Sequence, residues 1–253
     1  MSNMLVAVIL GIVEGVTEFL PISSTGHLIL VNRLAGFTGN FANTFDVVIQ
    51  LGAILSVVVY FWQRINPFSN TKTNQEKSET WDLWKKTIVG IIPALLIGGA
   101  IGKVVEEKLF NPLIVALALL IGGIVLIIIE NRDRVNNINS IKTLNYKTAF
   151  YIGLIQCLAM IPGTSRSAAT IIGAMILGAS RSVAAEFSFF LAIPTMMAAT
   201  AYSLLKIHTS LSGPEWQLII IGFAVSFLVA WGVIAAFMSY IRKKILNPSG
   251  IIG

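Results

Sequence analysis

The sequence is poor in cysteine, histidine and charged residues. Its 253 residues include one cysteine, Cys157, and two histidines, and only 12% are Asp, Glu, Lys or Arg. One cysteine excludes an intrachain disulfide and does not fit a cysteine-ligated metal cluster. No Lys or Arg precedes the first apolar run, so this run does not predict a cleaved signal peptide. A soluble domain carries about twice this charged fraction, so an ordinary soluble protein is excluded.

Long apolar segments take the place of the missing charge. Apolar residues make up 55% of the chain, and the mean hydropathy is +0.81. Five segments reach the roughly 20 residues that cross a hydrocarbon core; they are residues 42–62, 84–105, 111–130, 182–205 and 215–241. The sequence therefore predicts one all-α polytopic membrane domain over residues 1–253. The net charge of +6 is then expected in cytoplasmic loops and does not indicate nucleic-acid binding.

Two further apolar stretches, residues 3–35 and 145–179, are each broken near the middle. Pro21 and Pro162 stand at the breaks, and small hydroxyl residues follow each proline. Proline interrupts a helix, and each half has only about 14–17 residues, too few for a comfortable span. Both stretches are therefore predicted to be re-entrant helical hairpins, which enter and leave the membrane on one side and line a polar cavity.

The two broken stretches also resemble each other. Residues 11–26, GIVEGVTEFLPISSTG, align with residues 153–167, GLIQCLAMIPGTSRS, when one gap is allowed. The paired positions are Glu14 with Gln156, Pro21 with Pro162, Ser23-Ser24 with Thr164-Ser165 and, further on, Asp46 with Glu186. An internal repeat with a period of about 140 residues follows. It predicts a first repeat over residues 1–130 and a second over residues 145–241.

The distribution of basic residues predicts the topology. If the hairpins do not cross and the five long segments do, thirteen of the eighteen Lys and Arg residues share the side of loops 63–86 and 131–147. Such an excess marks the cytoplasmic side, so the N-terminus is expected outside. Three crossings separate the hairpins, so the repeats are inverted and the hairpins enter from opposite sides. Inverted repeats with broken helices place a polar site at the repeat interface near the membrane midplane.

The residues at the breaks suit a phosphate. Ser23 or Ser24 is expected to cap one helix, and Thr164 or Ser165 the other; a helix start binds phosphate through free amide groups. Arg166 adds a guanidinium group, which suits bidentate phosphate contact. The two helix starts and the Arg166 guanidinium at the tips thus point to anion binding within the membrane, where polar residues are expensive and usually functional.

Acidic and nucleophilic side chains accompany this anion site. Glu14 and Glu18 lie one turn apart on the same helical face, and such a pair suits a divalent cation, Mg²⁺ first, that also binds substrate phosphate. His27 follows Ser24 by three residues and could accept its proton. His208 lies in a polar loop and is expected to be solvated. Together these groups predict hydrolysis of a phosphate ester or anhydride on a lipid.

The motifs EGVTEFLPISSTGH, FDVVIQLGAILSVV, IPGTSRSAATI and AAEFSFFLAIP closely resemble those of the bacterial undecaprenyl-diphosphate phosphatases, also called bacitracin-resistance proteins. The resemblance covers about residues 5–245. It implies conversion of undecaprenyl diphosphate to the monophosphate in the cell membrane, at a site open to the outside, with a divalent cation (Mg²⁺, or Ca²⁺ as the alternative). This recycles the carrier for cell-wall synthesis and gives resistance to bacitracin, which competes indirectly by binding the substrate. Monomer and homodimer both stay open.

The resemblance also implies residue roles. Glu14, Glu18, Ser24, His27 and Arg166 correspond to the catalytic set, with Ser24 as nucleophile, His27 as base and the two glutamates as metal ligands. The implied phosphate-binding residues are Ser23, Thr25, Gly26, Gly163, Thr164, Ser165 and Ser167. Family members often have Gly where Ala168 stands, and they usually continue into a final membrane helix after the basic turn, whereas this sequence ends at NPSGIIG.

Two other functions share parts of this pattern. A transporter or flippase for an anionic lipid or solute also uses inverted hairpins, but anion transport gains nothing from an adjacent acid pair. The membrane phosphatases that form a phosphohistidine need a histidine shortly after Ser-Arg, and SRSAATII contains none. The enzyme is therefore the preferred prediction.

Overall fold

A computed structural model describes residues 2–109, 111–131, 136–206 and 211–246. His208 and the end of the chain after residue 246 lie outside this part. In the described residues the fold is all-α, and the only strand-like feature is one isolated bridge between Ile138 and Ala179. The helices are α1 (Asn3–Thr17), α2 (Ser24–Ala35), α3 (Asn40–Tyr60), α4 (Trp62–Ile65), α5 (Asn74–Leu109), α6 (Pro112–Glu130), η1 (Ile141–Thr143), α7 (Tyr146–Gln156), η2 (Cys157–Met160), α8 (Arg166–Ile176), α9 (Arg181–Lys206) and α10 (Gly213–Leu246).

Five described helices, α3, α5, α6, α9 and α10, are long and apolar enough to cross a membrane. They coincide with the five predicted segments, so the prediction of an all-α polytopic membrane protein is confirmed. The prediction of a continuous polar loop over residues 63–86 is wrong, because α4 and the first turns of α5 occupy much of it.

The early start of α5 has a local cause in the sequence TNQE. The Thr73 backbone N–H donates to Glu76 Oε2 at 2.7 Å, and the Glu76 N–H donates back to Thr73 Oγ1 at 3.3 Å. This reciprocal capping box satisfies amide groups that a helix start would leave unpaired. Lys86, which is buried, then fixes α5 to η1 by donating to the Ile141 and Lys142 carbonyls.

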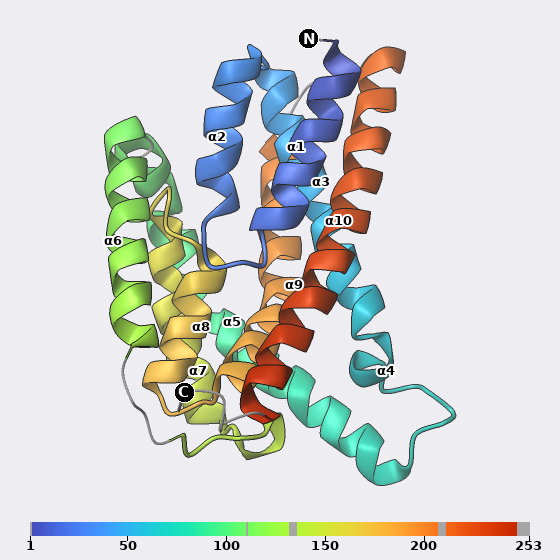
Figure 1. Ribbon diagram of the computed structural model, residues 1–253, viewed down its shortest axis with the longest axis vertical. Helices are drawn as coiled ribbons and strands as arrows, with labels where there is room; N and C mark the ends of the chain where they lie inside the picture. The colour runs from blue at the N-terminus through green and yellow to red at the C-terminus, as the bar shows by residue number, and fades with distance from the viewer. Residues whose placement is uncertain (1, 110, 132–135, 207–210, 247–253) are drawn as a thin grey trace, which may run out of the picture.

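The two predicted hairpins lie at opposite ends of the molecule (Figure 1). Helices α1 and α2 occupy the upper half of the view, and α7 and α8 the lower half. Their tips meet, since Ser167 Oγ donates to the Leu20 carbonyl at 2.8 Å. The functional groups at both breaks are thereby brought to one place inside the bundle.

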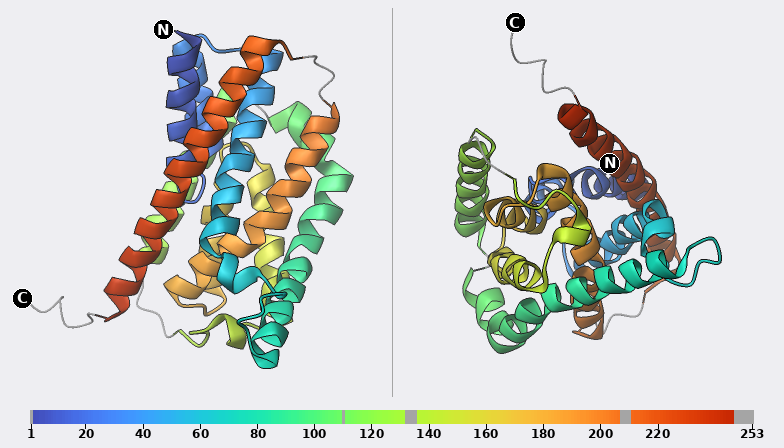
Figure 2. Two further views of the ribbon diagram at one scale, coloured as in Figure 1. Left: turned by 90° about the vertical axis from the view of Figure 1, so that its right-hand side faces the viewer. Right: turned by 90° about the horizontal axis from the view of Figure 1, so that it is seen from below.

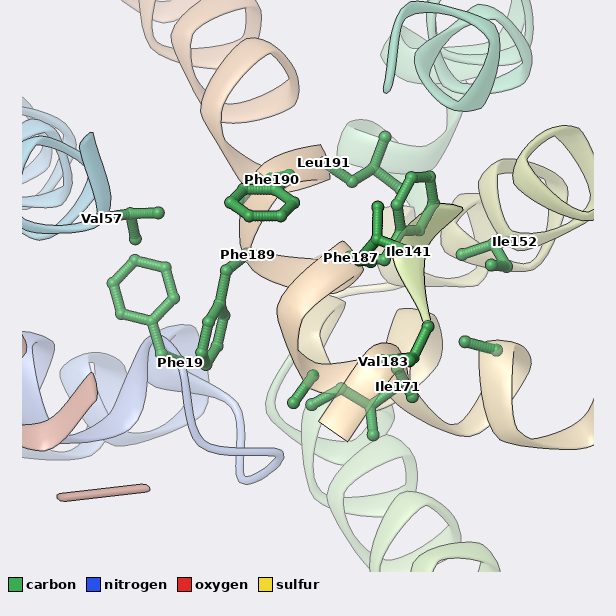
Figure 3. Close-up of a cluster of buried hydrophobic side chains, with 14 of the residues drawn as sticks. Phe19, Val57, Ile141, Ile152, Ile171, Val183, Phe187, Phe189, Phe190 and Leu191 are labelled. Atoms are coloured by element: carbon green, nitrogen blue, oxygen red, sulfur yellow. The ribbon is translucent and has the colours of Figure 1, made fainter. Parts of the chain in front are cut away.

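Buried aromatic rings connect the first hairpin to α9 (Figure 3). Phe19, at the tip, packs edge-on against Phe189 with ring centroids 5.4 Å apart, and Phe61 packs edge-on against Phe190 at 5.0 Å. All four side chains are buried. Burying rings of this size stabilises the fold and holds the tip against α9.

Close helix crossings complete the bundle. Helix α10 packs against α1 and α3 and itself spans most of the height of the molecule (Figure 2). A Cβ atom on Gly15 would lie 2.8 Å from the Ser226 carbonyl oxygen, and one on Gly153 would overlap the Gly90 carbonyl. Helix α6 lies at the edge of the bundle with most residues exposed, as expected of a helix that faces lipid.

Candidate active site

The first hairpin tip is shaped by an unusual backbone at Ser23. Helix α1 ends at Thr17, and the chain turns through Pro21 before α2 begins at Ser24. Ser23 has φ 66°, the only positive φ of a residue other than glycine in the described chain. This turn lets Ser23 Oγ accept the Gly26 N–H at 3.4 Å and cap α2. Backbone strain of this kind is concentrated at functional sites.

The second tip is shaped by a glycine and a serine cap. Gly163 has φ 92°, and a Cβ there would lie 2.6 Å from the Val115 carbonyl oxygen of α6, so a side chain does not fit. Ser165 Oγ accepts the Ala168 N–H at 3.1 Å and caps α8. Arg166, the first residue of α8, is thereby directed toward the first tip.

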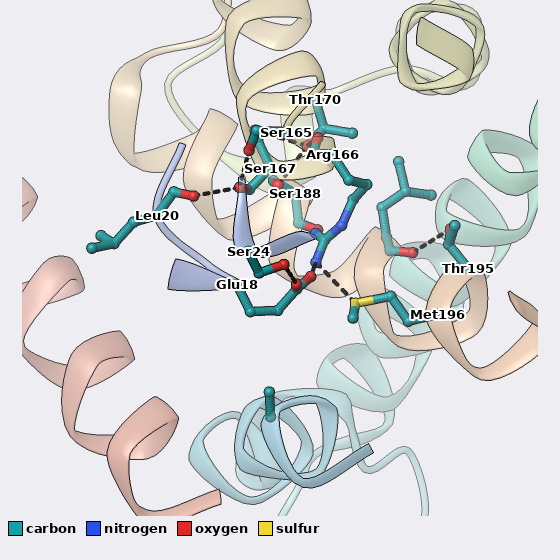
Figure 4. Close-up of polar contacts among 12 residues, drawn as sticks. Glu18, Leu20, Ser24, Ser165, Arg166, Ser167, Thr170, Ser188, Thr195 and Met196 are labelled. Atoms are coloured by element: carbon teal, nitrogen blue, oxygen red, sulfur yellow. Dashed lines mark hydrogen bonds and ion pairs between the residues drawn. The ribbon is translucent and has the colours of Figure 1, made fainter. Parts of the chain in front are cut away.

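Glu18 joins the two tips (Figure 4). Its Oε2 accepts the Ser24 hydroxyl at 2.5 Å, and its Oε1 accepts Arg166 Nη2 at 2.8 Å. Arg166 also donates to the Ser188 carbonyl at 3.3 Å, while its Nε is buried without a partner in the described chain. The two charged side chains are only 7% and 12% exposed, so their attraction is poorly screened.

A cavity of about 290 Å³ opens beside this ion pair. The predicted site residues that line it are Glu18, Ser23, Ser24, Thr25, Thr164, Ser165 and Arg166. Glu14, Gly26, His27, Gly163 and Ser167 do not line it. Ser167 instead bonds to Leu20, and Gly26 is buried against Leu119, so these two residues shape the tips from behind.

The cavity is also lined by Gln50, Gln156, Thr195 and Met196, none of which was predicted to be a site residue. The alignment of the repeats singled out one of them, because it pairs Gln156 with Glu14. Met196 Sδ accepts Arg166 Nη2 at 3.0 Å. No motif in the sequence indicated this contact, since it depends on how α9 packs.

His27 is placed differently from its predicted role. Its Nδ1 lies 2.8 Å from the Ser23 carbonyl oxygen. A carbonyl only accepts, so Nδ1 carries a hydrogen, and in the neutral ring the lone pair is on Nε2. The partner of the Ser24 hydroxyl is Glu18, not His27. The role of His27 as base stays a prediction, and Glu18 becomes a second candidate.

Among the described residues, the Glu14 carboxylate is buried without a group that would compensate its negative charge directly. It is fully buried, and no group of the described chain donates a hydrogen bond to its carboxylate oxygens; its near neighbour is the Glu18 carboxylate. Glu18 and Asp46 lie within electrostatic range and add negative charge, which Arg166 offsets in part. No described group of three or more His, Cys, Asp or Glu side chains could hold an ion alone. Two carboxylates with phosphate oxygens and water are nevertheless a usual Mg²⁺ set, so Glu14 and Glu18 fit one.

Comparison with known proteins identifies the family to which this chain belongs. Residues 7–252 match the family described as bacitracin resistance protein BacA. An undecaprenyl-diphosphatase of Fusobacterium nucleatum is 52% identical over 96% of this chain and 94% of its own. Undecaprenyl-diphosphatase 1 of Clostridioides difficile is 50% identical over 94% and 87%, and the undecaprenyl-diphosphatase of Limosilactobacillus fermentum is 48% identical over 99% and 93%. With the match extending over nearly all of its length, the chain belongs to the BacA family of bacitracin resistance proteins.

Proposed function

We propose that this chain is an integral membrane phosphatase that hydrolyses undecaprenyl diphosphate to undecaprenyl phosphate and inorganic phosphate. The names of its relatives, at about 50% identity, support this activity. Five apolar helices supply the membrane setting that a polyprenyl substrate requires. The reaction returns the lipid carrier to cell-wall synthesis, and bacitracin resistance is the property for which the family is named.

The observation that carries the proposal is the chain of contacts from Ser24 through Glu18 to Arg166. A hydroxyl, a proton acceptor and an anion-binding group line one cavity, and they come from two hairpins. A carrier of anions has no use for a carboxylate hydrogen-bonded to a serine. A phosphatase with a serine nucleophile needs this combination, because the hydroxyl oxygen must lose its proton as it attacks.

The first step transfers the terminal phosphoryl group to Ser24. Its Oγ attacks the terminal phosphorus while its proton passes to Glu18 Oε2. The bond from that phosphorus to the bridging oxygen breaks, and undecaprenyl phosphate leaves with the electron pair. Arg166 stabilises the charge on the transferred group. Its unpartnered Nε is a further donor toward that charge.

The second step releases inorganic phosphate. Water attacks phosphorus, the bond to Ser24 Oγ breaks, and Glu18 returns its proton to the serine oxygen. Both hydrogens of the water leave with the phosphate, so the enzyme is restored. Nε2 of His27 is the alternative acceptor in the first step.

A divalent cation, Mg²⁺ with Ca²⁺ as the alternative, belongs to this proposal. Glu14 and Glu18 would hold it, because the unpartnered oxygens of Glu14 lie one turn from Glu18. When bound, it would neutralise part of the diphosphate charge. Ser23, Thr25, Thr164 and Ser165 would contribute hydroxyls and helix-start amides to the same phosphates.

The orientation in the bacterial cell membrane is also proposed. We place the N-terminus and the opening of the site outside, because the lower end of the molecule in Figure 1 carries α4, the start of α5 and η1, which belong to the most basic loops of the sequence. Bacitracin would then meet the diphosphate lipid on the outer surface and compete by binding it. A homodimer and a monomer are both compatible with this orientation.

Phosphate release by the purified protein in detergent tests the proposal. Wild type should release phosphate from undecaprenyl diphosphate, and Ser24→Ala and Arg166→Ala should each lose at least about 100-fold in kcat. Thr71→Ala, in the exposed loop before α5, is the matched control and should keep full activity. A transporter would release no phosphate. A wild-type protein that binds the lipid but releases no phosphate would therefore refute the proposed phosphatase activity.

A further inference from the structure

One cavity residue combines deep burial with an unsatisfied polar atom and no assigned role. Gln156, the last residue of α7, is 3% exposed and lines the cavity. Its Oε1 has no hydrogen-bond partner in the described chain, and its Nε2 makes one long bond, 3.3 Å, to Thr195 Oγ1. A buried amide oxygen without a partner costs about 1–3 kcal/mol, so a group that completes it is needed.

The lining of the cavity is divided between two kinds of residue. The hairpin tips supply the charged and hydroxyl groups around Arg166. The other part of the lining comes from α5, η2 and α9 and is mainly apolar, comprising Ala94, Ala159, Met160, Met196 and Ala199. Met196 adjoins the charged part, since its Sδ accepts Arg166 Nη2. Thr195 directly precedes Met196, and Gln156 donates to Thr195, so the two polar side chains stand where the two parts of the lining meet.

A lipid diphosphate has the same order of chemistry along its length. If its terminal phosphate lies at Arg166 and its prenyl chain follows the apolar lining, the phosphate next to the prenyl group lies between them. We infer that Gln156, held by Thr195, forms the subsite for this inner phosphate. The inference rests on the proposed function.

The amide suits this position chemically. The oxygen and nitrogen of a glutamine amide have nearly the same shape, so a half-turn exchanges them. The Thr195 hydroxyl can donate or accept, and it now donates to the Leu191 carbonyl at 2.7 Å. After the half-turn the amide would direct N–H groups at phosphate oxygens. A neutral donor of this kind binds the leaving phosphate more weakly than a second arginine would, so the product can dissociate.

Two inhibitors separate the two phosphate subsites. Prenyl monophosphate, the product, carries only the inner phosphate, whereas inorganic phosphate takes the position of the terminal one. In Gln156→Leu we expect the inhibition constant of farnesyl monophosphate to rise about tenfold, because a hydrogen bond to a charged group is lost. The constant for inorganic phosphate should stay within about twofold, and the KM for farnesyl diphosphate should rise while kcat changes by less than about threefold.

Companion variants keep the result interpretable. Thr195→Val, which removes the hydroxyl at nearly constant volume, should weaken monophosphate inhibition in the same direction, and Thr195→Ser should restore it. Gln75→Leu, the same change at an exposed glutamine of α5 that does not line the cavity, should leave both inhibition constants unchanged. Equal weakening of both inhibitors, or no change in either, would overturn the inner-phosphate subsite. A wild-type protein that releases no phosphate would instead overturn the proposed function.

Discussion

At the scale of single residues, Glu18 is the central side chain of the site, because it contacts functional groups of both hairpins. One of its oxygens accepts from Ser24 and the other from Arg166, so the same carboxylate orients the nucleophile and joins the hairpins. In the described chain, His27 Nδ1 contacts the Ser23 carbonyl, and the Ser24 hydroxyl donates to Glu18. The two candidates for the base can therefore be distinguished by substitution.

Glu18→Gln should lower kcat by about 10²–10⁴-fold, because the amide cannot accept the serine proton. His27→Gln should lower kcat by less than about tenfold, since its bond to the Ser23 carbonyl is positional. Single-turnover phosphate release measures both, and thermal unfolding in detergent checks that each variant is folded. A larger loss in the histidine variant would return the role of base to His27.

Glu14→Gln addresses the proposed cation. Loss of one carboxylate from the pair should raise the Mg²⁺ concentration for half-maximal activity by at least about tenfold. Direct Mn²⁺ binding, followed by electron paramagnetic resonance, should weaken in parallel without any substrate. The matched control is Glu79→Gln on the exposed part of α5, where the acid pairs with Lys142. Unchanged Mn²⁺ affinity in Glu14→Gln would exclude it as a ligand.

Residue-level prediction from sequence succeeded where chemistry is local. Ser23 and Ser165 cap their helices through bonds that span three residues, which a short motif encodes. The partners of Arg166 on α9, and the presence of Gln156 and Thr195 in the cavity, depend on packing between distant helices. Such contacts leave no local pattern, so the sequence could not indicate them beyond the alignment of Gln156 with Glu14.

At the scale of helices, the start of α5 is a polar segment that hydropathy wrongly assigns to a loop. The segment from Asn74 is too polar for a membrane core, and a search for apolar runs assigns it to a loop. The TNQE capping box and the pairing of Lys86 with Asp82 make it a helix nonetheless. The capping motif was present in the sequence, so this boundary was predictable in principle.

The crossing of α7 over α5 depends on Gly153. A Cβ there would overlap the Gly90 carbonyl, which is backbone and cannot rotate away. Gly153→Ala should therefore lower the free energy of unfolding by about 1–3 kcal/mol, seen as a lower melting temperature in detergent. Gly122→Ala on α6, where nothing lies within 4 Å, should leave the melting temperature unchanged or slightly higher. Equal melting temperatures for the two variants would show that α7 moves away without cost.

At the scale of the whole molecule, hydropathy and proline positions determined most of the architecture. The five predicted spans and the two interrupted stretches all reappear as helices or as paired half-helices. Hydropathy and proline positions could not predict the contact between the two hairpin tips, because it is made by side chains about 150 positions apart in the sequence. The inverted relation of the two halves was argued from the odd number of crossings between the hairpins, and the cytoplasmic side from charge counts; both stay predictions about the membrane.

Cysteine labelling tests the orientation. In a Cys157→Ala background, Thr38→Cys lies in the exposed loop between α2 and α3, and Asn70→Cys lies in the exposed loop at the other end of the bundle. A membrane-impermeant maleimide added to intact cells should modify position 38 and spare position 70. Disrupted cells, in which both positions should react, provide the control. The reverse pattern in intact cells would invert the assigned topology.

The bond between Glu18 and Arg166 also governs how the polypeptide can be divided. Cleavage in the connection between α6 and η1 would leave the serine on one fragment and the guanidinium on the other. Because the hairpins approach from opposite ends, co-expressed fragments could rebuild the pair only when inserted in opposite directions and side by side. Turnover is thus a joint property of two pieces of chain, neither of which holds a usable site by itself.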